Sequence, residues 1–368
     1  MFISGHDQKV RRVCFSVPSR AAMVNTTNNL AAGLTDGLPT EEFVFSSAAK
    51  IALTVVISVV AAMGLFGNAM VVFIVIRYKD MHTVINYSFA NLALTDLTLL
   101  LLDAVPTAAD TAGINLSALL GCKVPIYLQY VSAEVTSLTL AFLSYDRYRL
   151  IVYPLKTLKR RSPLALLSIL LGIWLVSFVV QIPAVVVTGL TEEGKCYEFN
   201  APWGVEYFFS YALVSLFIIP TGIIVFCYVR MGRKLLEAGP IGSRKETRRR
   251  RSVKIVLAVT ILYALSWVPC HTVHLWMAFN PEITAESPLY VELHTAVNVL
   301  IFVNSSVNPY VYALIGPSYR HHIRSMVICS CRNASSQQNV NTVSSQKGKF
   351  CRYQIPGSST DPENSSRL

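Results

Sequence analysis

The stretch LAFLSYDRYRLIVYPLKTLKRR, residues 140–161, decides the fold because of where it places its charges. One acid and two arginines, Asp146, Arg147 and Arg149, directly follow a long and mostly apolar run, and four more basic residues follow within 156–161. A helix on the surface of a soluble protein spreads its charges along one polar face. In this stretch the charges begin only at residue 146, after the apolar run. This pattern predicts a helix that leaves an apolar environment near residue 146 and ends in water.

Charge is absent from most of the long apolar segments of the chain. Charged residues make up 14% of the 368 residues and hydrophobic residues 53%, whereas soluble domains are about 25% charged. Each segment is long enough for the roughly 20 residues with which a helix crosses the hydrocarbon layer. The sequence therefore predicts an all-α membrane protein with a seven-transmembrane helix bundle, because a large soluble helical protein would be left with almost no polar surface. Five segments contain no Asp, Glu, Lys or Arg (51–76, 162–191, 207–229, 255–281 and 293–319), and two contain only isolated acids (about 86–110 and 124–145).

The distribution of basic residues predicts the orientation of the chain. If the N-terminus lies outside, the segments after the first, third, fifth and seventh spans hold 25 of the 32 Lys and Arg residues. Cytoplasmic segments of membrane proteins carry such an excess. We therefore expect a multi-pass protein of the plasma membrane with an extracellular N-terminus. Its net charge of +11 then serves topology and contact with membrane lipid rather than nucleic-acid binding.

Composition divides the chain into four predicted segments. Asn25 in NTT forms a glycosylation sequon on the outer side. Cys329 and Cys331 are predicted palmitoylation sites, with a zinc site shared with the nearby histidines as the less favoured alternative; no metal site is predicted. The segments are an extracellular N-terminal segment (1–48), the seven-transmembrane bundle (49–316), a short amphipathic eighth helix (317–331) and a disordered cytoplasmic tail (332–368).

Two cysteines occupy outer positions close to the bundle. Cys122 stands at the start of the third span, and Cys196 stands in the loop between the fourth and fifth spans. Both face an oxidising compartment, which favours a disulfide between them and leaves the outer Cys14 unpaired. The bridge would hold this loop across the mouth of the bundle.

Polar and acidic side chains stand at mid-membrane positions of several predicted spans. An ionisable residue such as Asp96 costs roughly 2.5–3.5 kcal/mol to insert at the centre of a span, so it needs a partner or a hydrated cavity. We expect one pocket in which the carboxylate holds Na⁺ or takes a proton, although a hydrogen-bonded cluster that only joins the helices fits the same pattern. The residues of this predicted sodium pocket are Asn68, Asp96, Thr136, Asn304, Ser305 and Asn308. No other cofactor is predicted.

A set of short motifs occurs in the order found in one receptor family. Through this set, which runs from about residue 50 to 330, the chain resembles the rhodopsin-like (class A) G-protein-coupled receptors. The resemblance implies a receptor rather than an enzyme. Such a receptor catalyses nucleotide exchange on heterotrimeric G proteins and is then bound by receptor kinases and arrestin. The motifs are GN with Asn68, LALTD with Asp96, Cys122, DRY with Arg147, Trp174, Cys196, Pro220 with Tyr228, SWVP with Trp267 and Pro269, and NPYVY with Asn308, Pro309 and Tyr312.

The resemblance assigns roles to residues at the inner ends of the spans. Arg147 pairs with Asp146 when such a receptor is off, and turns toward Tyr228, Tyr312 and the G protein when it is on. The family's second restraint is an acid near the start of the sixth span. This chain reads TRRRRSVK at 247–254, so we expect no acid-based lock between the third and sixth spans. The predicted activation switch consists of Asp146, Arg147, Tyr228, Trp267, Pro269, Asn308, Pro309 and Tyr312.

The outer half of the bundle predicts the class of ligand. The resemblance excludes retinal, because Phe302 replaces the lysine that opsins use, and it argues against monoamines, because Gln129 replaces the aspartate that monoamine receptors use. The sixth and third spans, with SWVPCHTVHLW and VSAEVTSLTLAFLSYDRY, resemble galanin, allatostatin-A and kisspeptin receptors, which implies a short neuropeptide. Acidic outer loops favour a cationic or amidated peptide. The predicted ligand-binding residues are Gln129, Glu192, Glu193, Tyr197, Glu198, His271, His274 and Trp276.

Two other functions stay open at this point. A class A receptor for a non-peptide ligand would carry the same framework. A seven-span transporter is a more remote alternative, because it would need charged residues along a route through the bilayer, or repeated broken helices. The HTVH motif, residues 271–274, lacks the spacing and the glutamate of a zinc protease.

Overall fold

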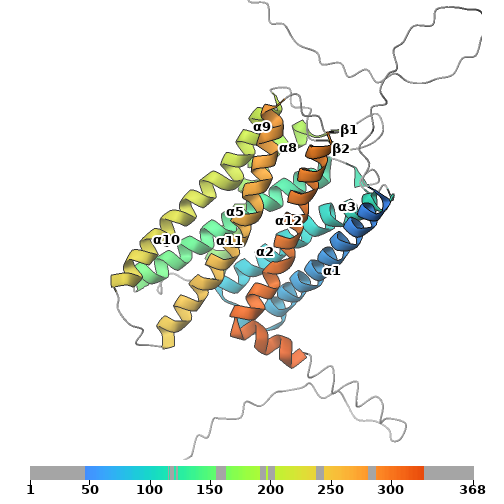
Figure 1. The fold of residues 1–368 in the computed structure, drawn as a ribbon. Coiled ribbons are helices and arrows are strands. Elements are labelled where there is room, and N and C mark those ends of the chain that lie inside the picture. The colour runs from blue at the N-terminus through green and yellow to red at the C-terminus, as the bar shows by residue number, and fades with distance from the viewer. Residues whose placement is uncertain are drawn as a thin grey trace, which may run out of the picture. The chain divides into compact units, whose positions relative to one another are not determined.

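The computed structural model describes residues 46–114, 116, 120–121, 123–154, 163–190, 196–197, 204–237, 244–280 and 287–326. Over these residues the chain is helical apart from turns and a two-stranded hairpin (Figure 1). The elements are α1 (Ser47–Arg77), η1 (Lys79–Met81), α2 (Val84–Leu99), η2 (Leu100–Ala104), α3 (Val105–Thr111), α5 (Lys123–Val152), α7 (Pro163–Val180), α8 (Ile182–Val187), β1 (Gly189–Leu190), β2 (Cys196–Tyr197), α9 (Val205–Ala212), η3 (Leu213–Ile218), α10 (Ile219–Glu237), α11 (Arg244–Phe279), α12 (Pro288–Ile315) and a last helix over 317–326.

Seven helical stretches in the described part of the chain are long and apolar enough to cross a membrane, which confirms the predicted bundle. Large apolar side chains cover their outer faces, and Ile76 and Leu164 are 73% and 75% exposed. Water would disfavour so large an apolar surface, so this is the face that meets lipid. The spans are Ser47–Arg77, Val84–Thr111, Lys123–Val152, Leu164–Val187, Val205–Lys234, Arg250–Phe279 and Pro288–Ile315.

Side-chain caps set where the first two spans begin. Ser46 Oγ accepts a hydrogen bond from the Ala49 N–H at 3.2 Å, and Thr83 Oγ1 accepts one from the Asn86 N–H at 3.4 Å. Both caps satisfy amide donors that have no partner within the helix, and they fix the residue at which each span leaves the turn before it.

Prolines lie within or next to the helices of several spans, and π-helical turns interrupt two of the spans. Pro269 and Pro309 lie inside α11 and α12. The π-helical turns η2 and η3 come shortly before Pro106 and Pro220. Proline lacks an N–H and crowds the carbonyl four residues earlier, and a wider helical turn relieves that crowding. Sequence periodicity did not indicate these two turns.

The third span, α5, is the centre of the packing. It contacts α2, α7 with α8, α10 and α11, which belong to four other spans (Figure 1). On the other side of the bundle α1 packs against α2 and α12. Residues on α5 are therefore in direct contact with the second, fourth, fifth and sixth spans.

The last helix, 317–326, begins after Gly316 at the inner end of α12. The imidazole of His322 stacks on Tyr78 with 4.0 Å between ring centroids, and its Nε2 lies 2.8 Å from Asp80 Oδ2. These contacts hold the helix against the turn between the first two spans. The tail beyond residue 326 and the segment before residue 46 lie outside the described residues.

Candidate functional site

A cavity of about 260 Å³ lies among the outer halves of five spans. Its wall includes the predicted ligand-binding residues Gln129, His271 and His274, whereas Trp276 is not part of the lining. Glu192, Glu193 and Glu198, and the side chain of Tyr197, lie outside the described residues. The lining consists of Leu99, Leu102, Asp103, Pro106, Thr107, Leu120, Gly121, Pro125, Ile126, Gln129, Tyr130, Ala133, Phe209, Ala212, Leu216, Trp267, Cys270, His271, His274, His294, Asn298 and Ile301.

The amide of Gln129 has a structural task as well as a place in the cavity. Pro106 has no N–H, so the carbonyl of Leu102 loses the donor that a regular helix would supply. Gln129 Nε2 donates to this carbonyl at 3.0 Å and joins the second and third spans.

Two other backbone carbonyls also lack their helical N–H donor because a proline follows four residues later, and a side chain from another span supplies a donor to each of them. Pro220 releases the carbonyl of Leu216, and the hydroxyl of Tyr263 donates to it at 2.8 Å. Pro309 releases the carbonyl of Ser305, and Asn68 Nδ2 donates to it at 2.9 Å. Each donor belongs to a different span from the proline. In a membrane these cross-span bonds satisfy groups that water cannot reach.

Imidazole and aromatic rings form the wall of the cavity on the fifth, sixth and seventh spans. His274 stacks on Phe209 with 4.8 Å between centroids and lies 5.5 Å from His294, whose ring stacks on Tyr290 at 5.3 Å. His271 lies 5.7 Å from Trp267. We did not predict His294, although its place in the first turns of the seventh span gave a signal that it faces the outer cavity.

Deeper in the bundle, the structure brings together part of the predicted sodium pocket. Asp96 is 4% exposed, and its Oδ2 accepts a hydrogen bond from Asn308 Nδ2 at 2.9 Å. Asn68 is bound to the backbone of Ser305, as described above. Thr136 bonds instead to Thr95 at 2.8 Å. The buried Oδ1 atoms of Asn68, Asn304 and Asn308 have no hydrogen-bond partner among the described residues.

A second buried acid, Glu134, lies in a separate polar cluster. Gln181 Nε2 donates to Glu134 Oε2 at 2.9 Å and also lies 3.4 Å from Ser215 Oγ. These contacts join the third, fourth and fifth spans. Gln181 occupies the break between α7 and α8, which no sequence motif marks.

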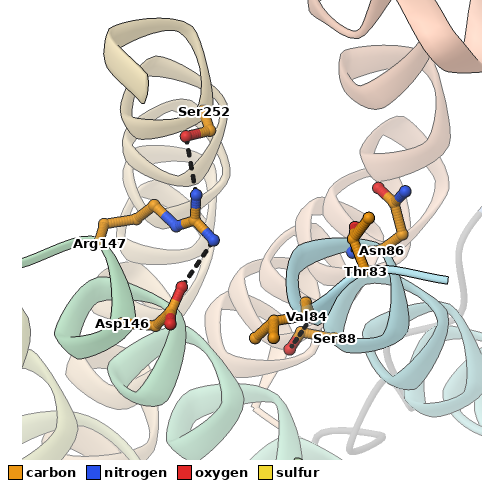
Figure 2. A network of polar contacts seen from close by, with 7 residues as sticks. All are labelled: Thr83, Val84, Asn86, Ser88, Asp146, Arg147 and Ser252. Atoms are coloured by element: carbon orange, nitrogen blue, oxygen red, sulfur yellow. Dashed lines mark hydrogen bonds and ion pairs between the residues drawn. The ribbon is translucent and has the colours of Figure 1, made fainter. Parts of the chain in front are cut away.

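The predicted switch residues at the inner end of the third span form a short chain of polar contacts. Arg147 Nη2 lies 2.6 Å from Asp146 Oδ2, and Arg147 Nη1 donates to Ser252 Oγ at 2.9 Å (Figure 2). The first contact has the geometry expected from the resemblance. The second joins the third span to α11, within the TRRRRSVK stretch. The partner that α11 offers to Arg147 is therefore a neutral hydroxyl and not an acid. We expected no acid-based lock between these spans.

Other predicted switch residues lie along the same axis. Tyr312 is fully buried, and its ring stacks on Phe89 with 4.2 Å between centroids. Trp267 lies 5.7 Å from Tyr263 and lines the cavity. Tyr228 packs at the edges of the core clusters near the inner ends of α5 and α10. Trp267 and Tyr312 belong to the same buried core cluster, and Tyr228 packs against that cluster.

From the roles that the receptor resemblance implies, replacing Ser252 with alanine should raise the activity in the absence of agonist. A hydrogen bond to the partly buried guanidinium of Arg147 contributes on the order of 1 kcal/mol, and its loss would shift the off–on equilibrium roughly fivefold. The measurement is basal nucleotide exchange on purified G protein. Ser252→Thr keeps the hydroxyl and serves as the matched control. Equal basal rates for the alanine and threonine variants would mean that this contact restrains nothing.

Comparison with known proteins agrees with this arrangement. Residues 67–312 match the family described as 7 transmembrane receptor (rhodopsin family). The chain is 31% identical to the KiSS-1 receptor of Homo sapiens over 291 residues, which cover 73% of each chain. It is 29% identical to G-protein coupled receptor 54 of Oreochromis niloticus over 288 residues, 73% of this chain and 76% of that protein. It is 27% identical to neuropeptide Y receptor type 2 of Sus scrofa over 302 residues, 77% and 78% of the two chains.

The family match covers most of the chain, including the spans that carry the cavity, the buried polar pocket and the Arg147 contacts. The protein is therefore a multi-pass membrane protein that signals as a receptor and is not an enzyme. On the sequence, the fold and the site together, the chain belongs to the rhodopsin family of seven-transmembrane, G-protein-coupled receptors.

Proposed function

We propose that the protein is the receptor for a short cationic or amidated neuropeptide and that the bound peptide drives nucleotide exchange on a heterotrimeric G protein. The observation that carries this is the continuity of α11. One helix presents Trp267, His271 and His274 near the cavity and Ser252 to Arg147. Trp267 lies fifteen positions after Ser252, which is roughly 22 Å along a helix. Pro269 lies inside that helix, so a ligand that moves the outer part can displace the inner end.

The peptide class is supported by the names of relatives and by charge. Similar chains include a KiSS-1 receptor and a neuropeptide Y receptor. The predicted outer loops contain Glu192, Glu193 and Glu198, which would attract a cationic peptide toward the cavity mouth. The test is a screen of amidated basic peptides on cells that express the chain, read by calcium and by cAMP. A small-amine library screened in parallel covers the non-peptide alternative, and activation only by that library would overturn the peptide proposal.

Sodium is the proposed allosteric ion of the buried pocket. Asp96 would supply the charged ligand, and the neutral side-chain oxygens of Asn68, Asn304 and Asn308 fit a hard cation because the described residues leave them without partners. The ion would offset the cost of a buried carboxylate and stabilise the off state. Its affinity would then fall when the receptor is activated.

Replacing Asp96 with asparagine should remove the response to sodium. The purified native protein should melt at a higher temperature in sodium chloride than in N-methylglucamine chloride of equal ionic strength, because sodium at ten times its Kd raises the free energy of unfolding by about 1.4 kcal/mol. The difference should vanish in Asp96→Asn, since the amide cannot supply the charge. Thr98→Val, which removes an exposed hydroxyl bonded within the same span, is the control. A sodium response retained in Asp96→Asn would refute the proposed site.

The remaining assignments concern processing and partners. We propose plasma-membrane insertion with an extracellular N-terminus, and phosphorylation of the tail by receptor kinases followed by arrestin binding. The modification sites lie at positions that are outside the described residues or whose side chains are not described. They are the Cys122–Cys196 disulfide, glycosylation at Asn25, and palmitoylation at Cys329 and Cys331.

A further inference from the structure

We propose that the carboxyl group of Glu134 is a proton-binding site and that the bound proton joins the third span to the fourth. Glu134 is 3% exposed and lies within the span Lys123–Val152. It belongs neither to the lining of the ligand cavity nor to the Asp96 pocket or the Arg147 contacts. The inference therefore goes beyond the proposed function, and it does not depend on which ligand activates the receptor.

The surroundings of Glu134 offer little to an ionised carboxylate. A buried charge needs a cation or several hydrogen-bond donors to offset the loss of water. The carboxyl group of Glu134 accepts one bond, from Gln181 Nε2 at 2.9 Å, while the hydroxyl of Ser137 donates to the backbone carbonyl of Glu134 instead. No lysine, arginine or histidine among the described residues forms an ion pair or a hydrogen bond with Glu134. A neutral carboxylic acid is the form that these contacts accommodate at the lower cost.

The titratable neighbours of Glu134 on the fifth and sixth spans do not change this balance. Tyr211 and Tyr263 lie within electrostatic reach of Glu134. A phenol has a single O–H to donate, and each of these two donates it to a backbone carbonyl, at 2.6 and 2.8 Å. His271, also on α11, packs against aromatic rings and makes no hydrogen bond to Glu134. These neighbours therefore supply neither a positive charge nor a donor to the carboxyl group.

The amide of Gln181 indicates the partner of the bound proton. Gln181 is fully buried, and its Nε2 faces Glu134 Oε2 at 2.9 Å and Ser215 Oγ at 3.4 Å. Its Oε1 atom is buried too, but it has no hydrogen-bond partner among the described residues. A protonated Glu134 donates its O–H to this oxygen, which gives an acid–amide pair with two hydrogen bonds. An ionised Glu134 offers only acceptors and leaves the amide oxygen without a donor.

Turning the Gln181 amide over does not remove the need for this proton. The amide oxygen would then take the place of the nitrogen, 2.9 Å from Glu134 Oε2. Two oxygen atoms at that distance require a hydrogen between them. The proton on Glu134 supplies it in this arrangement as well.

The acid–amide pair also reaches the π-helical turn of the fifth span. Ser215, which accepts a hydrogen bond from Gln181, belongs to η3. The next residue of this turn, Leu216, accepts the hydroxyl of Tyr263 from the sixth span. Loss of the proton would place a buried charge without a cation in this link. The proton on Glu134 therefore supports a turn that the fourth and sixth spans both hold.

Infrared spectroscopy at about pH 7 tests the protonation of Glu134. Acids in water lose their proton near pH 4, so exposed acids give no carboxylic acid C=O band at this pH. The protein is purified in dodecyl maltoside, which has no carbonyl group of its own. We expect an acid band in the native protein that is absent from Glu134→Gln and present in Asp96→Asn, which removes the buried acid of the second span.

Glu134→Gln should also melt at no lower temperature than the native protein, because its amide can donate to Gln181 and accept from it as the neutral acid does. An acid band that is missing from the native protein or unchanged in Glu134→Gln would overturn the proposal. Failure of Glu134→Gln to fold would overturn it as well, since a neutral pair at this position would then be insufficient.

A second variant tests whether Gln181 is the partner of the acid. Gln181→Met keeps a side chain of similar length and removes both the donor and the acceptor. The Glu134 band should move to higher frequency, because a carboxylic acid C=O that loses its hydrogen bonds becomes stiffer. Ser168→Ala, which removes an exposed hydroxyl from the same span, should leave the band in place. An unshifted band in Gln181→Met would overturn the pair. These spectra need neither agonist nor G protein, so the proton site and the proposed peptide function can fail separately.

Discussion

Replacing Arg147 with alanine should reduce agonist-stimulated nucleotide exchange by at least about 100-fold, equivalent to roughly 2.7 kcal/mol. Arg147 is 6% exposed and links Asp146 on its own helix with Ser252 on α11. Alanine removes the restraint that these contacts provide, and it also removes the group that the family resemblance directs to the G protein in the on state. The loss of the second role dominates, because a loosened receptor that lacks its contact group cannot promote GDP release.

The control for this experiment lies two residues away. Arg149 is also basic, belongs to the same helix and donates to the hydroxyl of Tyr145 at 3.3 Å. Arg149→Ala changes the net charge by the same amount as Arg147→Ala, and it should retain most of the stimulated exchange. Surface amounts of both variants are measured with an N-terminal tag, and exchange is normalised to them. Native-like exchange by Arg147→Ala would contradict the assigned role.

Replacing Gly64 with valine should remove nearly all folded protein from the cell surface. A Cβ atom at this position would lie 2.3 Å from Ser306 Oγ, 2.5 Å from Leu100 Cδ1 and 3.0 Å from Ser306 Cα. Ser306 Oγ cannot move away freely, because it donates to the carbonyl of Val60 at 2.9 Å. The first span would have to separate from the seventh, and overpacking of this kind costs about 3 kcal/mol or more.

Gly172 provides the matched control for Gly64. It belongs to the fourth span, and a Cβ atom built there meets nothing within 4 Å. Gly172→Val should reach the surface in nearly native amounts, because its side chain would extend into open space on the lipid side. Surface labelling and the melting temperature of the solubilised protein are the measurements. Similar surface amounts for the two valine variants would contradict the close approach of α1 and α12.

The fold could be predicted from the sequence because a charged side chain is costly to place in the hydrocarbon layer of a membrane. The absence of charge from segments such as 255–281 and 293–319 indicated the spans, and the structure has helices there. The π-helical turns could not be predicted, since they depend on how a proline and its neighbours share space in three dimensions. Pro106 and Pro220 were visible in the sequence, but the donors that satisfy Leu102 and Leu216 come from other spans.

Part of the candidate site could be predicted, namely the residues whose type alone is unusual within a membrane span. Asp96 and Arg147 are expensive to place in a membrane, so their presence indicated function. Ser252, Asp103 and His294 gave weaker signals. A serine within a basic stretch is ordinary, and only the packing of α11 against α5 makes it a partner for Arg147. The side of the second span on which Asp103 lies depends on η2, which the sequence pattern did not reveal.

The most direct measurement is GDP release from purified Gα subunits by the protein in lipid nanodiscs without any ligand. The native protein, Ser252→Ala and Arg147→Ala are compared with empty nanodiscs on each class of Gα. The account predicts that Ser252→Ala accelerates release from at least one class more than the native protein does, and that Arg147→Ala does not accelerate it at all. Release by Ser252→Ala equal to that of empty nanodiscs on every class, or acceleration by Arg147→Ala, would contradict it.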